Sequence, residues 1–196
     1  MTACQKNIDG ILELSLKPIL KQDGYRKSGR TWHREYKDAI QVVNIQSSRW
    51  NDSNEAGFAI NVGCYYPQVA KLLGDEVLQK PKEYECMTRA RLGSLKPERT
   101  DLWWKITPDG ATDSIAKEII QLWEKYGNPW INANAKIEQA LNDEKHILGV
   151  SYILGMYSLA RTPEETRSVF HRILQERPSA VALIKDTAKK LGIDGG

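Results

Sequence analysis

The sequence contains few of the residues from which metal sites, disulfide frameworks and hydrolytic centres are built. Its 196 residues include only three cysteines and three histidines. Cys4, Cys64 and Cys86 are an odd number at wide spacing and form no CxxC pair, which argues against both a disulfide framework and a zinc site. No GxSxG, HExxH, P-loop or GxGxxG motif is present. The sequence therefore implies no cofactor and favours a protein without catalytic activity.

Long apolar runs are also lacking. No stretch approaches the ~18 consecutive apolar residues that a membrane-spanning helix needs. The first residues contain no apolar segment followed by a small-residue cleavage site, so they do not indicate export. With 41% hydrophobic and 27% charged residues, the chain is long enough to close one sizeable core. We therefore expect a globular cytoplasmic protein with no membrane partner.

The net charge of +3 is too small to indicate nucleic-acid binding by itself, but it is unevenly distributed. Residues 1–50 contain nine Lys and Arg against five Asp and Glu, so the positive excess lies in the first quarter of the chain.

Alternating side chains predict a sheet in the first half of the chain. Period-two patterns predict strands over 31–36, 39–49 and 57–66, with tight turn chemistry at Ser28-Gly29 and Lys37-Asp38. Two shorter strands are expected at 86–92 and 102–106. These segments predict an antiparallel sheet of about five strands.

Helical periodicity frames this sheet. It predicts an opening helix over 8–22 with Asn7 as N-cap and a disturbance at Pro18, and a later helix with Thr112 or Asp113 as N-cap and Gly127 at C′. Further helices follow, one of them opened by a capping box at Thr162. The sequence thus predicts an α+β fold in which the sheet packs with an N-terminal helix and a following helix. It also predicts a C-terminal all-helical appendage, with an α+β domain over 1–128 and a helical segment over 129–196.

Amide and arginine side chains coincide on neighbouring predicted strands. Amides are poorly favoured within strands unless a partner satisfies them, so their grouping indicates a polar, cationic sheet face. Such a face would suit an anionic group or an acidic protein surface. The equally open alternative is that these side chains form hydrogen bonds between the sheet and a covering helix, or that they face water. The candidate residues are Asn44, Gln46, Arg49 and Asn61, joined by Arg34, Arg89 and Arg91.

A second candidate is the basic stretch around the first hairpin, where arginine forks would pair with phosphate and an aromatic ring would stack on a base. The alternative is a solvated hairpin whose charges protect a sheet edge. The residues concerned are Arg26, Lys27, Arg30, Trp32 and Arg34.

Three motifs follow one another at compatible spacing, and they lie in residues 24–34, 43–50 and 58–63. Together they resemble the bacterial domain-of-unknown-function 4304 family over residues 5–125. The family pattern is GF-x-K-x-G-R-x-aromatic, then N-x-Q-x-S, then a short N-x-G strand; Tyr25 stands where the family usually has Phe. The resemblance implies a small cytoplasmic bacterial protein with no established enzymatic activity, and some members resemble immunity proteins that accompany polymorphic toxins. The matching residues are Lys27, Gly29, Arg30, Asn44, Gln46, Ser48 and Asn61.

The sequence therefore favours a non-catalytic protein that binds another macromolecule, with an immunity protein that neutralises a toxin as the leading hypothesis. The alternative is a module that binds nucleic acid or a nucleotide through the basic hairpin and the polar sheet face. A hydrolase or transferase acting on an anionic substrate would need a general base that the sequence does not identify.

Overall fold

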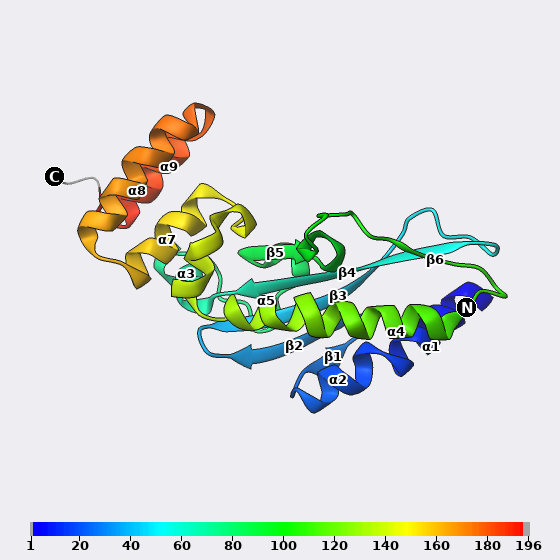
Figure 1. The fold of residues 1–196 in the computed structure, drawn as a ribbon. Coiled ribbons are helices and arrows are strands. Elements are labelled where there is room, and N and C mark those ends of the chain that lie inside the picture. The colour runs from blue at the N-terminus through cyan, green and yellow to red at the C-terminus, as the bar shows by residue number, and fades with distance from the viewer. Residues whose placement is uncertain (1, 194–196) are drawn as a thin grey trace.

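A computed structural model describes residues 2–193 and contains a six-stranded sheet in which every pairing is antiparallel. Strands β1 to β5 lie side by side in chain order, and β6 pairs with β4 (Figure 1). The short strands β5 and β6 pair with different parts of β4, at 61–64 and 56–58. The predicted α+β class and sheet are confirmed. The strands are β1 (Arg26–Ser28), β2 (Thr31–Tyr36), β3 (Ala39–Ser47), β4 (Ala56–Tyr65), β5 (Thr88–Arg91) and β6 (Trp104–Ile106).

Two-residue turns fix the register of the first three strands. Ser28 pairs with Thr31 across the first turn, and Tyr36 pairs with Ala39 across the second. Gly29 (φ 62°) and Lys37 (φ 56°) adopt the left-handed backbone conformation that tight hairpin turns require. Because each register is fixed by its turn, the alternation of each strand determines which side chains share a face of the sheet.

One face of the sheet forms the core. Residues opposite each other in an antiparallel pair project to the same side, and on this side most of the paired side chains are apolar and buried, with Arg34 and Gln41 as a polar pair among them. Helices cover this side, and the opposite face carries Asn44, Gln46 and Asn61. The core side chains include Trp32, Val43, Ile45, Phe58, Ile60 and Val62.

Figure 1 shows α4 lying along the sheet beside α1, with α5 continuing it toward the far end. The helices and single turns are α1 (Ala3–Leu14), α2 (Leu16–Gln22), α3 (Pro67–Leu73), η1 (Glu83–Glu85), η2 (Leu92–Leu95), α4 (Thr112–Leu122), η3 (Trp123–Gly127), α5 (Asn128–Ala133), α6 (Ile137–Ala140), η4 (Leu141–His146), α7 (Val150–Ala160), α8 (Pro163–Glu176), η5 (Pro178–Ala180) and α9 (Val181–Lys190).

The opening helix starts earlier than predicted, and the disturbance expected at Pro18 is a break in the helix. It begins at Ala3, where Thr2 rather than Asn7 is the N-cap and forms a capping box with Gln5. It breaks at Ser15 (φ −121°, ψ −97°) into α1 and α2. Pro18 explains the break three residues earlier, because its ring clashes with the carbonyl of residue 14 and it has no N–H to donate there.

The helix that starts at Thr112 does not end at Gly127, and its N-cap is Ala111 rather than Thr112 or Asp113. Instead, one turn of π-helix, η3, carries the backbone directly into α5, and Gly127 keeps a helical φ of −66°. The predicted boundary at 128/129 falls inside this helical run. The division of the chain into two domains stays a prediction.

The last helices extend away from the sheet. Thr162 is the N-cap of α8 and forms the predicted capping box with Glu165, which confirms the predicted start of this helix. Figure 1 shows α8 and α9 as a hairpin projecting beyond α7 at one end of the molecule. Within residues 2–193, no helix is long and apolar enough to cross a membrane.

Candidate functional site

Two rows of residues run across the face of the sheet opposite the core helices. In one row, Thr31, Asn44, Asn61 and Arg91 follow one another on β2, β3, β4 and β5. In the next row, His33, Val42, Gly63 and Arg89 do the same. The registers therefore bring the predicted amides together with two arginines from a strand about thirty residues further along the chain.

A loop between α3 and β5 crosses part of this face. The Tyr65 hydroxyl donates to the Glu76 carbonyl (3.0 Å) and accepts from the Leu78 N–H (3.1 Å), and the His33 ring donates from Nε2 to the Pro81 carbonyl (2.8 Å). The loop packs closely on the sheet at Gly63, where an added Cβ would lie 2.7 Å from that of Cys86. This approach places η1, and with it Glu83, above the sheet.

The loop and the sheet border an open cavity of about 820 Å³, and this volume is within the range of ligand-binding sites. Its floor is the first of these rows together with Gln46 and Arg89, and its rim includes Tyr84, which is 62% exposed. The lining residues are Thr31, Asn44, Gln46, Asn61, Lys82, Glu83, Tyr84, Arg89, Ala90, Arg91, Ser94, Asp101, His146 and Leu148.

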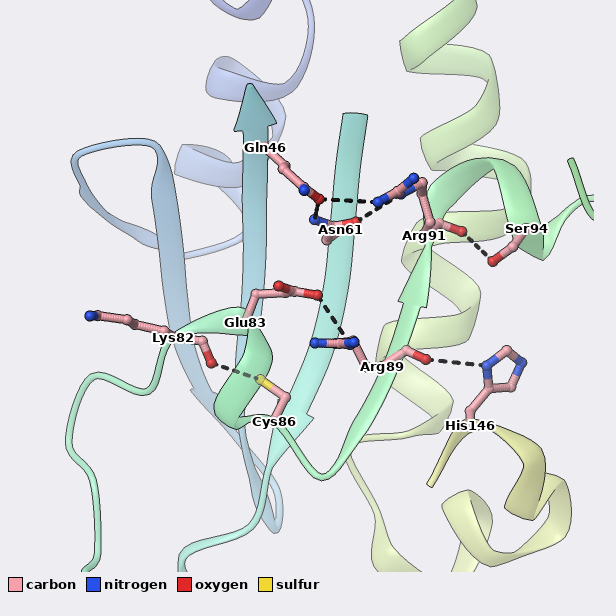
Figure 2. A network of polar contacts seen from close by, with 9 residues as sticks. All are labelled: Gln46, Asn61, Lys82, Glu83, Cys86, Arg89, Arg91, Ser94 and His146. Carbon is pink, nitrogen blue, oxygen red and sulfur yellow. Dashed lines mark hydrogen bonds and ion pairs between the residues drawn. The ribbon is translucent and has the colours of Figure 1, made fainter. Parts of the chain in front are cut away.

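Arg91 is held by three neighbours, two of which, Gln46 and Asn61, are drawn in Figure 2. Its Nε donates to Asn61 Oδ1 (3.2 Å), its Nη2 donates to Gln46 Oε1 (3.1 Å), and its Nη1 pairs with Asp101. Asn61 also donates to Gln46 Oε1 (2.9 Å). The amides of two strands thus fix the plane of this guanidinium, which explains why amides occupy these strand positions.

Arg89 is held differently. Its Nε lies 3.2 Å from Glu83 Oε1, and Figure 2 shows the two side chains pointing toward each other across the strands. Burial raises the pKa of the Glu83 carboxyl, while the nearby Arg89 and Arg91 charges act in the opposite direction.

His146 lies at the edge of the cavity. Its Nδ1 donates to the Arg89 carbonyl (3.3 Å), and its ring packs edge-on against Trp130. Burial lowers the pKa of His146, and the Asp143 carboxylate partly opposes this effect. The neutral ring is therefore favoured near neutral pH.

The structure gathers only part of the predicted site. Asn44, Gln46, Asn61, Arg89 and Arg91 all line the cavity, with Asn44 donating to Thr31 Oγ1 (2.9 Å).

The other predicted residues lie elsewhere. Arg30 is in the first turn and pairs with Asp9 (3.1 Å), and Arg49 stacks on exposed Trp50 beyond β3. Lys27 places its ammonium 5.2 Å from the centre of the Trp32 ring.

Two residues of the basic stretch are turned toward the helices. Trp32 is only 2% exposed, so it offers no ring on which a base could stack. Arg34 donates to Gln41 Oε1 (2.8 Å), the Asp23 carbonyl (2.9 Å) and Asn132 Oδ1 (2.6 Å), which joins β2 to α5. The expectation that Arg34 joins Asn44 on one face is wrong, because Arg34 pairs with Gln41, and that position alternates with position 44.

Sequence reasoning missed several cavity residues. Lys82 and Glu83 come from the crossing loop, Asp101 from the segment before β6, and His146 from η4. None belongs to an alternating strand, so periodicity gives no signal for them. No group of three or more His, Cys, Asp or Glu side chains among residues 2–193 is arranged to hold a metal ion.

Comparison with known families identifies the fold unit. Residues 16–133 match the model of a domain of unknown function, DUF4304, which covers more than half of the chain. The chain belongs to this family. The match begins and ends later than the predicted 5–125 and includes α5, which agrees with the continuous helical run from α4. No significant match was found among curated proteins or among solved structures.

Proposed function

We propose that this protein is a non-catalytic binding protein of the bacterial cytoplasm that receives an acidic segment of a protein partner on the open sheet face. An immunity protein that neutralises a toxin is the form of this function that we favour. The observation that carries the proposal is the pair of arginines, Arg89 and Arg91, held in place at the floor of an open cavity.

Preorganisation supports binding at this face. Arg91 is already fixed by Asn61, Gln46 and Asp101, so little side-chain entropy remains to be lost when a partner arrives. A planar guanidinium suits the two oxygens of a carboxylate, and arginine and tyrosine are enriched among the residues that dominate protein interfaces. Tyr84 on the rim adds such a contact.

The charge of the cavity supports an acidic partner. Lys82, Arg89 and Arg91 carry three positive charges, against the two carboxylates of Glu83 and Asp101. Complementary charge raises association rates and selects among partners. Burial of Trp32 removes the stacking platform on which the nucleic-acid alternative relied, so the geometry favours a protein.

Co-expression with the product of the neighbouring open reading frame tests the proposal. We expect a stoichiometric complex and rescue of growth when that product is toxic. Arg91→Ala should weaken the complex by about 2 kcal/mol, roughly thirtyfold, because a buried interface arginine is lost. Lys105→Ala, which removes an exposed cation from β6, is the matched control and should leave affinity unchanged.

Recovery of no protein partner, or equal affinity of Arg91→Ala and the unmodified chain, would contradict the proposal. Binding of nucleic acid that falls steeply with salt would replace it with the alternative.

A further inference from the structure

Glu83 is the sole ion-pair partner of Arg89 within residues 2–193. It is carried by a single 3₁₀ turn in the crossing loop, whereas Arg89 stands on β5. The Glu83 side chain is 15% exposed and that of Arg89 is 36% exposed. A carboxylate from outside the sheet thus already lies against Arg89 in the lining of the cavity.

We propose that Glu83 occupies the position of the partner's carboxylate, so that binding exchanges this internal carboxylate for an aspartate or glutamate side chain of the partner. This inference rests on the proposed function and names the chemistry that the cavity recognises. It also makes the Arg89–Glu83 pair an autoinhibitory contact that weakens binding of unsuitable partners.

The two arginines differ in a way that assigns the exchange to Arg89. Arg91 keeps two amide acceptors, from Asn61 and Gln46, whatever happens to its carboxylate. Arg89 has no hydrogen bond to an amide in the part of the chain that the structure describes, so its neutralisation depends on a carboxylate alone. When Glu83 moves away, Arg89 loses the ion pair that neutralises it, and an incoming carboxylate therefore restores that ion pair.

The turn that carries Glu83 does not depend on the Glu83 side chain. The Lys82 N–H donates to Glu85 Oε2 (2.6 Å), and the Cys86 N–H donates to the backbone carbonyl of Glu83 (3.2 Å). Burial raises the pKa of the Glu83 carboxyl, which means that desolvation disfavours its charged form. A neutral side chain at position 83 is therefore compatible with the same backbone.

A fluorescent hexaglutamate peptide, titrated at low salt into the full chain, serves as the probe. Glu83→Gln should bind it about fivefold more tightly, since it releases a partly exposed ion pair worth up to about 1 kcal/mol. Glu55→Gln removes the same charge at an exposed site beside Lys105 and should change affinity little. Arg89→Gln should bind most weakly, with thermal unfolding confirming that each variant is folded.

Equal or weaker binding by Glu83→Gln would overturn the inference, as would an equal gain in Glu55→Gln, which would indicate a general charge effect. Absence of peptide binding by every variant would also overturn it. If the co-expressed partner binds and Arg91→Ala disrupts it while Glu83→Gln has no effect, only this inference fails. If Glu83→Gln binds the peptide more tightly but no partner exists, the carboxylate site stands and the proposed function fails.

Discussion

At Gly127, the missing side chain determines how closely the long helical run approaches η2. An added Cβ would lie 2.7 Å from Trp123 Cε3 and 2.9 Å from Leu92 Cδ1, closer than real Cβ contacts. Its φ of −66° is available to any residue, so glycine is needed here for space and not for backbone freedom. A glycine that ends a helix at C′ and a glycine required by close packing both follow an apolar helical segment. The sequence pattern does not distinguish these two roles, and it therefore predicts a C′ glycine.

Gly127→Ala should lower the free energy of unfolding by about 1–2 kcal/mol, because overpacking exceeds the gain in helix propensity. Gly10→Ala is the matched control, since Gly10 lies within α1 with nothing near its Cβ position. That variant should gain about 0.5–1 kcal/mol. Urea unfolding measures both changes. A Gly127→Ala variant as stable as Gly10→Ala would contradict the packing argument.

The candidate site illustrates what residue-level reasoning reaches. Asn44, Gln46 and Asn61 could be grouped from sequence because strand alternation fixes their faces. Arg34 could have been assigned to the correct face as well. The two-residue turn at Lys37-Asp38 pairs Tyr36 with Ala39, and this register places Arg34 opposite Gln41. Glu83 could not be assigned, since its position depends on how a loop without periodicity folds back over the sheet.

At the scale of elements, strands were predicted more closely than helices. The segments 31–36 and 57–66 lie within a residue of β2 and β4, because a buried strand shows its period directly. The break between α1 and α2 follows from Pro18 and not from the spacing of the apolar residues, which continues across it. Periodicity therefore identifies which segments are helical but gives their ends less well.

One polar cluster joins α8 to the rest of the chain. Arg172 Nη2 donates to both carboxylate oxygens of Glu144 (2.8 Å each), and the Tyr157 hydroxyl donates to the same carboxylate (2.7 Å). Glu144 belongs to η4, which contacts β5, so the cluster connects the helical hairpin with the part of the chain that carries the site.

Arg172→Ala should therefore loosen α8 and α9 while leaving the sheet intact. Loss of a partly exposed pair of up to about 1 kcal/mol should raise amide exchange in 163–190 by about fivefold. Lys190→Ala breaks an exposed pair with Asp186 within α9 and should change exchange little. Hydrogen exchange with mass spectrometry separates the regions, and equally rapid exchange in β3 and β4 would show that the cluster stabilises the whole molecule instead.

At the scale of the whole molecule, buried titratable groups set how stability depends on pH. Burial raises the pKa of Cys64 to about 12 from its ordinary value near 9, and burial also raises the pKa of Cys86 and Tyr66. Cys64 Sγ donates to the Ile131 carbonyl (3.6 Å) under α5. These groups are thus neutral in the folded protein at pH values where the unfolded chain would ionise them.

A group whose pKa is raised by folding contributes its full stabilisation below the pKa of the unfolded chain and loses it as pH rises through the folded value. We expect the free energy of unfolding to fall between pH 9 and 12, by up to about 1.4 kcal/mol per pH unit for each such group. Urea unfolding across this range measures the slope, and thiol labelling should stay slow until the protein unfolds. Unchanged stability up to pH 12 would contradict the burial of these groups.

The order of the strands bears on how the chain folds. β1 to β4 follow one another with neighbours in sequence paired in space, so the meander needs only short loop closures. β6 reaches β4 only after an intervening segment of about forty residues. The meander is thus favoured to form early, and the edge of β4 that receives β5 and β6 remains open until the later part of the chain arrives. A nascent chain released before residue 106 would display that edge as a template for pairing with other chains.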